Sequence, residues 1–365
     1  MRLVSITLQH FRIYPAQSFV FSPTVTVFIG NNAIGKTNIL EAVTLSAIGK
    51  SFRATRDSDM VTWGEEVGRV KSIVVPTVPQ HEHEETILEV MLTSGIVNGQ
   101  KTQIKKYLVN GIPRRQLDFI GNIHVVLFAP TDLELVTDSP SIRREYLNFV
   151  ISQVDREYRR NLQSYERGLR QRNSLLDRIN EGTASRSQLL FWNQLLIKAG
   201  TYITEARKRF IDHVNTYTLD DLQYRLVYDP SIISEARLDQ YKEEEIAAKS
   251  TLVGPQRDDF RFEKIDINNT YIDISRFGSR GEQRLAVLWL KLAELRFVEE
   301  KNGDRPLLLL DDVFSELDGG SRHLVLDVIS KQQTVITSAE EDVIDLFTKT
   351  ADVKIVQLPV RKKTV

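Results

Sequence analysis

The sequence predicts an α/β fold with mixed sheets, together with a largely helical second lobe that contains a long antiparallel helix pair. Three observations indicate this fold class. Short runs with alternating apolar residues dominate residues 1–130. Apolar residues recur at helical spacing through about residues 140–215. Strand and helix patterns alternate in the last third of the chain, which is typical of a buried, largely parallel sheet.

Length and composition set further limits. The chain has 365 residues, more than one ordinary core holds, and we expect one lobe at 1–130 and 296–365 and a second at 131–295. With 48 basic and 49 acidic side chains the net charge is -1, so a polyanionic partner would have to be held by a local patch. The absence of cysteine excludes disulfides and thiolate metal sites. No signal peptide or membrane-length apolar run is visible, so we expect a cytoplasmic protein without a membrane partner.

Turn and cap residues position the elements of the first half. Asn110 and Gly111 stand between two alternating runs, where a two-residue hairpin turn needs residues that accept positive φ. A single helix is predicted directly after Lys36. Ser139 is a capping residue type and Pro140 suits the first position of the next helix.

Two apolar stripes predict the long helix pair. The first is formed by Leu147, Val150, Ile151, Val154, Tyr158, Leu162, Tyr165 and Leu169. After a polar break at 180–188, the second is formed by Leu189, Trp192, Leu196, Ala199, Ile203, Ala206 and Phe210. Two long helices joined by a short loop should pack antiparallel. Beyond them we expect strands within about 250–275, a helix from Gln283 to about Val298, and strands in LLLLDD, QTVITSA and VKIVQLP that are separated by helices.

The stretch GNNAIGKT matches the phosphate-loop pattern G-x-x-x-x-G-K-[ST], with a strand before it and a helix after it. Glycines allow the backbone amides to curl around phosphate groups, Lys36 neutralises the β and γ oxygens, and Thr37 offers a hydroxyl to Mg²⁺. The pattern therefore predicts an ATP site formed by Gly30, Asn31, Asn32, Ala33, Ile34, Gly35, Lys36 and Thr37.

An acidic pair completes this site. The apolar run LLLL ends in Asp311, where a phosphate-loop protein needs a carboxylate for its metal. Asp312 follows, and we expect Asp311 to hold Mg²⁺ and Asp312 to orient the attacking water, with Lys36 as the second catalytic residue. A solvated Asp-Asp turn is the alternative, but the four leucines favour a buried strand.

A third motif lies in FGSRGEQR, at about 278–284, where Ser279 and Gly281 precede an apolar-periodic helix. An exposed helix start attracts anions, yet a second such start is redundant within one monomer. With a phosphate loop and an acidic strand end in the same chain, the motif resembles the signature of ABC-type ATPase heads, which completes the ATP site of an opposite subunit. The stretch from Ser315 to Asp318 resembles the D-loop of the same class.

Taken together, these motifs resemble the RecF family of bacterial recombination mediators, which are related to SMC-type ATPase heads. The resemblance covers nearly the whole chain and is carried by LQHFRIY, GKTNILEAV, KSFR, FAPTDLELVTDSPSIRREYLN, LVGPQRDDF, SRGEQRLAVLWLKLAE and LLLLDDVFSELD. It implies an ATP-dependent homodimer that is a weak, DNA-stimulated ATPase. It also implies binding to duplex DNA and single-strand/duplex junctions, partnership with RecR, and a functional link to RecA and RecO.

Three departures from related ATPases are visible, one from the RecF family and two from ABC transporters. Glu282 stands where RecF proteins usually carry Gln, and those proteins usually carry His in the stretch that reads GPQRDD here. Ser338 and Ala339 stand where ABC transporters place a switch His, so the residue that senses the γ-phosphate is unassigned. No glutamine near LFAPTD matches the Q-loop of transporters.

Arginines predict a surface for DNA phosphates. Residues 143–178 carry nine Arg against five acidic residues, which is also typical of a solvated helix face. Arg53 lies where SMC-type heads place an arginine that couples DNA to nucleotide, with a structural ion pair as the alternative. The predicted DNA residues are Arg53, Arg143, Arg144, Arg156, Arg159 and Arg160.

Other classes fit the sequence less well. A transporter subunit predicts a switch His and a short helical subdomain, and an SMC protein needs arms of hundreds of heptad residues. A kinase needs an acceptor pocket or lid, for which no motif is visible. The sequence therefore favours a DNA-binding ATPase that switches between open and closed dimers, with an SMC-like or transporter-type subunit as the alternative.

Overall fold

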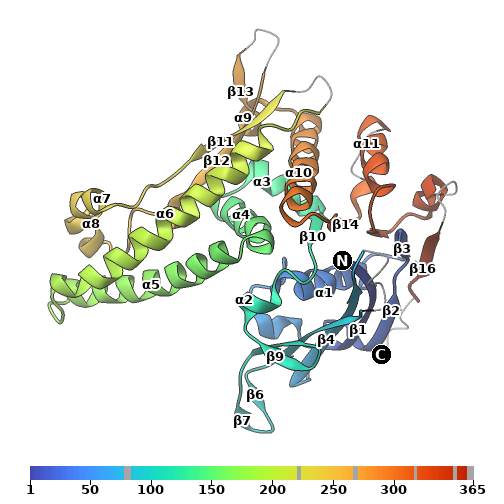
Figure 1. Ribbon diagram of the computed structural model, residues 1–365, viewed down its shortest axis with the longest axis horizontal. Helices are drawn as coiled ribbons and strands as arrows, with labels where there is room; N and C mark the ends of the chain where they lie inside the picture. The colour runs from blue at the N-terminus through green and yellow to red at the C-terminus, as the bar shows by residue number, and fades with distance from the viewer. Residues whose placement is uncertain (78–83, 220–222, 266–269, 316–318, 348–351, 360–365) are drawn as a thin grey trace. The chain divides into compact units, whose positions relative to one another are not determined.

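A computed structural model describes residues 1–77, 84–219, 223–265, 270–315, 319–347 and 352–359 (Figure 1). The chain divides into two compact units, Met1–Asp132 with Val298–Val365, and Leu133–Phe297. The predicted lobe limits fall beside these boundaries. That each unit acts as a functional lobe stays a prediction.

The first unit contains an antiparallel sheet of six strands. Asn110 and Gly111 have φ values of 52° and 76°, so the predicted two-residue hairpin is confirmed between its last two strands. A small ribbon of β6 (Ile96–Val97) and β7 (Gln100–Lys101) accompanies this sheet. The strand order is β2 (Tyr14–Val20), β1 (Arg2–Phe11), β4 (Val67–Val75), β5 (Thr86–Thr93), β8 (Lys105–Val109) and β9 (Ile112–Arg114).

The second sheet of this unit is parallel throughout, as predicted for the last third of the chain. Its central strands are buried along their whole length, since both faces of a parallel sheet are covered. The strand order is β10 (Val125–Phe128), β14 (Leu307–Asp311), β15 (Thr334–Ser338), β3 (Val25–Ile29) and β16 (Val353–Gln357).

Helix α1 (Lys36–Ile48) packs against strands of both sheets. Every residue from Ile39 to Ile48 is buried, including Glu41 and Thr44. The helix therefore has no solvent face, and its first turn is held in place from two sides.

Shorter elements complete the unit: η1 (Asp57–Met60), α2 (Gln116–Phe119), η3 (Pro130–Leu133), η6 (Val313–Ser315), α11 (Gly319–Ile329) and η7 (Glu341–Phe347). The last one is a 3₁₀ segment where a helix was predicted. Among the described residues, no helix combines the length and apolar character needed to cross a membrane.

The second unit begins with α3 (Glu134–Thr137) and α4 (Pro140–Val154). Pro140 takes the first helical position as predicted, but the Ser139 hydroxyl bonds to Ser141 and makes no cap bond. The single long helix predicted from the first stripe is wrong, because the chain breaks at Asp155 and resumes as α5 (Arg156–Asn180). The Asp155 carboxylate accepts the Tyr158 N–H at 2.8 Å and the Tyr202 hydroxyl at 2.9 Å, so it starts a new helix.

Helices α5 and α6 (Leu189–Val214) form the predicted antiparallel pair and lie side by side in Figure 1. The polar break predicted between them contains the connecting turn and η4 (Arg186–Gln188). Their facing residues are buried, notably Tyr158 and Tyr165 on α5 and Leu196, Ile203 and Phe210 on α6.

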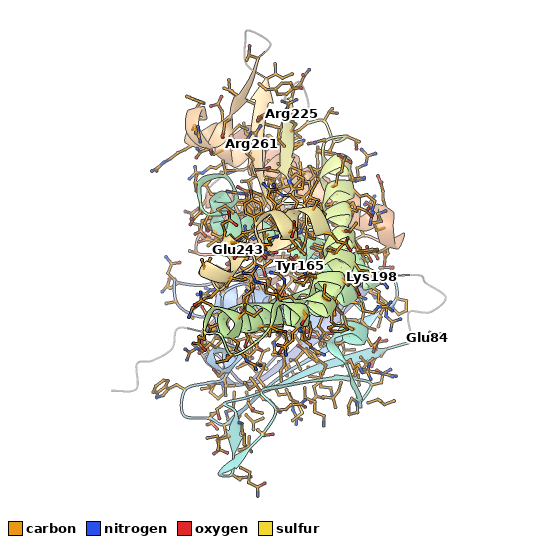
Figure 2. All side chains as sticks on the ribbon, turned by 90° about the vertical axis from the view of Figure 1, so that its left-hand side faces the viewer. Glu84, Tyr165, Lys198, Arg225, Glu243 and Arg261 are labelled. Carbon is orange, nitrogen blue, oxygen red and sulfur yellow. The ribbon has the colours of Figure 1, made fainter. Side chains whose placement is uncertain are left out.

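An antiparallel sheet of three strands, β11 (Tyr224–Asp229), β12 (Asp259–Ile265) and β13 (Tyr271–Asp273), also belongs to this unit. The first of these strands was not predicted. Arg225 and Arg261 both pair with Glu263 and lie near one another in Figure 2. Between β11 and β12 come α7 (Glu235–Gln240), α8 (Lys242–Ala247) and η5 (Pro255–Arg257).

Helix α9 (Ile274–Phe277) leads to α10 (Arg280–Asn302), which starts three residues before the predicted Gln283. Residues 286–295 of α10 are all buried, so this stretch of the helix has no solvent-exposed face. Glu294, a buried polar residue of α10, is hydrogen-bonded, since its carboxylate accepts the Tyr146 hydroxyl at 3.0 Å.

Two buried ion pairs bind α8 and the segment after it to the helix pair. Arg207 of α6 contacts Asp258 at 2.8 Å, and Arg172 of α5 contacts Glu245 at 2.6 Å. Gly254 has a φ of 121°, and a Cβ there would lie 2.2 Å from the Tyr165 hydroxyl oxygen. The segment GPQRDD therefore has a structural function in holding the helix pair.

We predict that Arg207→Met destabilises the protein by about 3–5 kcal/mol, because Asp258 would remain as a buried charge without its partner. The measurement is urea-induced unfolding of the full chain followed by circular dichroism. Lys208→Met is the matched control, since Lys208 pairs with Asp212 on the surface and its loss should cost less than about 1 kcal/mol. Equal losses in the two variants would contradict the structural importance of the buried pair.

Candidate functional site

The predicted phosphate loop connects β3 to α1, and its backbone shape is fixed by neighbouring strands. The Gly30 N–H donates to the Ser338 carbonyl at 3.3 Å, and the Tyr14 hydroxyl donates to the Gly35 carbonyl at 3.2 Å. Ala33 and Gly35 have φ values of 65° and 109°. A Cβ on Gly35 would lie 2.5 Å from the Ile13 side chain, so this position accepts only glycine.

Lys36 lies inside the curve of the loop. Its ammonium group donates to the Gly30 carbonyl at 2.5 Å and to the Asn31 carbonyl at 3.2 Å. Burial lowers the pKa of Lys36, while the charges of Asp312 and Asp311 act in the opposite direction. The lysine is therefore placed where phosphate oxygens could replace the two carbonyl groups as acceptors.

Asp311 joins three elements at the end of β14. Its Oδ1 accepts the hydroxyl of Thr37 at 3.0 Å and the hydroxyl of Thr337 at 2.7 Å. Thr37 begins α1 and Thr337 belongs to β15, so the two hydrogen bonds connect the phosphate loop to neighbouring strands.

The Thr37 hydroxyl and the Asp311 carboxylate fit magnesium, which prefers oxygen ligands and usually binds one or two carboxylates together with substrate phosphates. Over the part of the chain that the structure describes, no group of three or more His, Cys, Asp or Glu side chains could hold a metal ion. The metal would therefore depend on this pair and on the phosphates of a bound nucleotide.

Asp312 adopts a left-handed backbone conformation with a φ of 55°. Its N–H donates to the Thr337 carbonyl at 3.0 Å, and its carboxylate accepts the Ala339 N–H at 3.3 Å. Such a conformation costs about 1–3 kcal/mol in a non-glycine residue and is often found at functional sites. The Ser315 hydroxyl donates to the Asp312 carbonyl at 2.7 Å, while the rest of the predicted D-loop lies outside the described residues.

The end of β15 contributes contacts that sequence reasoning missed. Ser338 was noted only as a replacement for a switch histidine, yet its carbonyl fixes Gly30 and the next amide contacts Asp312. These are backbone interactions, so no side-chain motif could have indicated them. The available signal was the parallel sheet itself, because the carboxyl ends of neighbouring parallel strands meet at one edge.

The predicted signature motif lies in the second unit, and Ser279 occupies the position before the first residue of α10. Its N–H donates to Glu282 Oε2 at 2.7 Å, and its hydroxyl accepts the Glu282 N–H at 3.3 Å. These reciprocal bonds form a capping box. Space is open around Gly281, since a Cβ there would have a single neighbour, the Ser279 hydroxyl oxygen at 3.9 Å.

The predicted DNA arginines differ in their surroundings. Arg143 pairs with Asp259 at 2.6 Å, Arg144 donates to the Asp258 carbonyl at 3.0 Å, and Arg159 is 9% exposed and donates to the Ser152 carbonyl. These three side chains make contacts within the second unit, and that they also face DNA stays a prediction. Arg53 is exposed and reaches toward Asn38 on the first turn of α1, at 3.5 Å.

Exposed arginines on α5 share one face of that helix. At about 100° per residue they fall within about 80° of arc, opposite the buried face that contains Tyr158 and Tyr165. They are Arg156, Arg160, Arg167, Arg170 and Arg178. Arg156 and Arg160 belong to the predicted set, and the other three were not singled out from the sequence.

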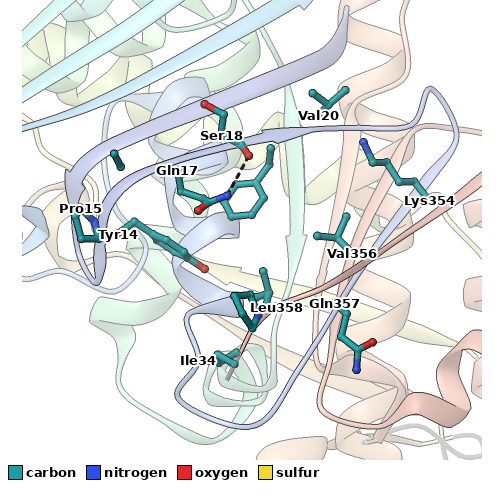
Figure 3. A pocket seen from close by; sticks show the side chains of 13 residues that line it. Tyr14, Pro15, Gln17, Ser18, Val20, Ile34, Lys354, Val356, Gln357 and Leu358 are labelled. Carbon is teal, nitrogen blue, oxygen red and sulfur yellow. Dashed lines mark hydrogen bonds between the residues drawn. The ribbon is translucent and has the colours of Figure 1, made fainter. Parts of the chain in front are cut away.

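A pocket of about 470 Å³ lies beside the phosphate loop (Figure 3). It is lined by Ile34 of the loop, by β2 from Tyr14 to Val20, and by residues of β16 and the segment after it, including Lys354 and Leu358. Lys36, Thr37, Asp311 and Asp312 do not line it. The pocket is therefore adjacent to the candidate phosphate site and separate from its charged groups.

Comparison with known proteins identifies the family. The sequence profile of the RecF/RecN/SMC N-terminal domain matches residues 2–361. The DNA replication and repair protein RecF of Herpetosiphon aurantiacus is 37% identical over 375 aligned residues, which cover 94% of each chain. The chain belongs to the RecF family. The RecF protein of Macrococcus caseolyticus is 33% identical and aligns with 94% of this chain and 95% of its own.

Solved structures of RecF have the same fold. The structure of the recombination mediator protein RecF-ATPrS in the RecFOR pathway has a TM-score of 0.82 and 29% identity, covering 98% of this chain and 96% of its own. The corresponding RecF-ATP structure has the same TM-score, 30% identity and coverage of 93% and 92%. An SMC head bound to the C-winged helix domain of ScpA, at 16% identity, has a TM-score of 0.52 over 99% of this chain and 95% of its own, which shows a shared fold. The predicted fold class, an ABC-type ATPase head with a helical lobe, is confirmed.

For this RecF family member, we predict that Asp311→Asn removes most of the magnesium dependence of ATP binding. The amide oxygen still accepts hydrogen bonds from Thr37 and Thr337, but the charge that attracts the metal is lost. The ratio of ATP affinities with and without Mg²⁺ should fall at least about tenfold, a typical effect of altering a metal site. Calorimetric titration with a slowly hydrolysed ATP analogue measures this ratio.

Asp327→Asn provides the control for that experiment. Asp327 is exposed on α11 in the same unit, and the substitution changes the net charge equally. The magnesium ratio should stay at the wild-type value in this variant. A ratio that is also unchanged in Asp311→Asn would place the metal on other ligands.

Proposed function

We propose that this chain is an ATP-dependent DNA-binding protein of recombinational repair. In the proposed cycle, two copies enclose two ATP molecules and close on duplex DNA near single-strand gaps or junctions. With RecR, and linked to RecO, the closed pair promotes RecA loading in the cytoplasm. Hydrolysis, which is weak and stimulated by DNA, reopens the pair and makes the protein a switch.

The observation that carries the proposal is the arrangement of charged and polar groups around Asp311. The first unit contains a phosphate loop, a lysine within its curve, a hydroxyl–carboxylate pair 3.0 Å apart and a second acid beside them. This set matches what phosphoryl transfer from ATP requires. The names of relatives support the context, since they describe DNA replication and repair and RecF bound to ATP.

The chain's own residues divide the work in this proposal. Lys36 and the loop amides bind the β and γ phosphates, and Thr37 with Asp311 binds the metal. Mg²⁺, when bound, neutralises charge on the phosphate oxygens. Asp312 orients a water molecule for attack on the γ-phosphorus, so that the bond to the β-phosphate oxygen breaks and ADP and phosphate form.

The signature residues act on the other copy of the chain. Ser279 and the open space at Gly281 receive the γ-phosphate bound by the partner's Lys36, because the positive end of the helix dipole at a helix start favours an anion. ATP then binds the pair more tightly than a single copy. A shift from 1% to 99% of the closed form needs about 10⁴-fold tighter binding to that form.

DNA contacts are assigned to the exposed arginine face of α5. From Arg156 to Arg178 the helix rises about 33 Å, which is close to one turn of duplex DNA. Phosphate contacts of this kind carry no sequence information, so binding should depend on DNA shape and on salt. Arg53 remains a proposed contact near the nucleotide.

A mixing experiment tests the dimer. Ser279→Arg should leave ATP binding to the monomer nearly intact and block ATP-driven dimerisation, because it adds bulk at the signature residue and not in the phosphate loop. Lys36→Met should bind ATP weakly. In a heterodimer of the two variants, one interface pairs an intact Lys36 with an intact Ser279, so the mixture should recover dimer that neither variant forms alone. Analytical ultracentrifugation with a slowly hydrolysed ATP analogue measures the outcome.

Two results would oppose the shared site. Normal ATP-driven dimerisation of Ser279→Arg alone would show that the ATP site is complete within one chain. Impaired ATP binding by the Ser279→Arg monomer would place the serine at the nucleotide of its own chain.

The DNA surface is tested with a triple variant, Arg160→Ala, Arg167→Ala and Arg170→Ala. The log-log salt slope for duplex binding should fall by about 2 to 3, since each phosphate contact contributes about 1. A second triple variant, Lys198→Ala, Lys208→Ala and Arg209→Ala on exposed positions of α6, removes the same charge and should change the slope little. Equal slopes for the two variants would move the DNA surface away from α5.

A further inference from the structure

Glu282 places a negative charge at the start of the signature helix. Its Oε2 accepts the Ser279 N–H at 2.7 Å, so the carboxylate lies against the first turn of α10. In the proposed dimer, the γ-phosphate of the partner approaches the same turn. Two negative charges would then share a small region, and like charges this close repel each other.

Lys264 neutralises this carboxylate. It lies on β12, and its ammonium group contacts Glu282 Oε1, while Oε2 remains bonded to Ser279. The Lys264 contact and the Ser279 amide lower the pKa of Glu282. Both partners are partly buried, with side-chain exposures of 23% for Lys264 and 33% for Glu282, so water screens the pair incompletely.

The surrounding contacts hold the pair in position. The Gln283 side chain donates to the Ile274 carbonyl at 3.3 Å, and the Gly278 N–H donates to the same carbonyl at 3.0 Å. A Cβ on Gly278 would lie 2.7 Å from that oxygen, so the chain before Ser279 packs closely on α9. Glu282 therefore cannot move away from the helix start without loss of its cap bonds.

We propose that Lys264 is a positioning residue that neutralises Glu282, and that it thereby sets the ATP concentration at which two copies of the chain associate. The inference rests on the proposed function, since it concerns the same shared ATP site. It explains how a carboxylate can lie beside a helix start that is proposed to bind the partner's γ-phosphate. The capping geometry keeps the carboxylate there, and the lysine on the adjacent sheet removes its net charge.

A double-mutant cycle tests the proposal in the full chain. Lys264→Met should raise the concentration of ATP analogue needed for half-maximal dimerisation by about tenfold, the order of effect of one unit charge near a surface anion. Glu282→Gln keeps an oxygen for the Ser279 N–H, removes the charge, and should dimerise at or below the wild-type concentration. The double variant should match Glu282→Gln, because the lysine then has no charge to neutralise. ATP binding to the monomer should be the same in all four proteins.

Arg261→Met is the matched control. Arg261 lies on β12, like Lys264 (Figure 2), and pairs with Glu263 at 2.9 Å. Arg261→Met therefore removes one positive charge and one ion pair of β12, as Lys264→Met does. Its dimerisation midpoint should stay within about twofold of wild type. A shift equal to that of Lys264→Met would assign the effect to overall charge and overturn the proposal.

The outcomes separate this inference from the proposed function. A wild-type midpoint in Lys264→Met, or a double variant as impaired as Lys264→Met, would overturn the inference while the dimer stands. The second result would mean that Lys264 supports the fold and not the charge balance. A wild-type chain that stays monomeric with the ATP analogue would contradict the proposed function and this inference together.

Discussion

The two hydrogen bonds that Asp311 accepts from Thr37 and Thr337 form the junction on which the nucleotide site depends. They connect the first turn of α1, the end of β14 and the end of β15, three segments far apart in sequence. Because α1 is buried between two sheets, the position of Thr37 is fixed. The parallel register of β14 and β15 fixes the positions of Asp311 and Thr337 at the ends of these strands. Lys36 follows from the same arrangement, because it precedes Thr37 and folds back over the loop. The positions of the site residues thus depend on the packing of α1 and the strands as much as on the residues of the phosphate-loop motif.

Sequence patterns predicted those parts of the molecule in which local chemistry and fold agree. The Asn110-Gly111 hairpin, the phosphate loop and the LLLL strand each need particular residue types at fixed positions, and all three elements are present. Ser279 and Gly281 also lie at a helix start as expected, although the helix begins earlier than predicted. The roles of these residues in catalysis and dimerisation remain predictions.

The errors arose where tertiary contacts override a periodic pattern. The apolar stripe continues through Asp155, but its carboxylate binds Tyr158 and Tyr202, so the helix is interrupted. Arg159 carries the same charge as Arg160, yet Arg159 is buried against the last turn of α4 and Arg160 is exposed on the surface of α5. Charge counts along a helix do not separate these two cases, because exposure depends on which face packs. The backbone contacts of Ser338 and Ala339 leave no trace in residue type at all.

The buried polar contacts of the helix pair limit the kinds of motion available to it. Arg172 of α5 bonds to Asn193 of α6 at 2.8 Å toward one end of the pair, and the Tyr158 hydroxyl accepts a bond from Arg207 at 3.2 Å toward the other. Purely apolar helices could slide past one another by a turn and bury similar surface. Here a slip of one turn would break these contacts and would separate Arg172 from Glu245 or Arg207 from Asp258, leaving a buried carboxylate unpaired. Tilting or rotation of both helices together therefore costs less than a change of register between them, because it keeps the buried polar contacts intact.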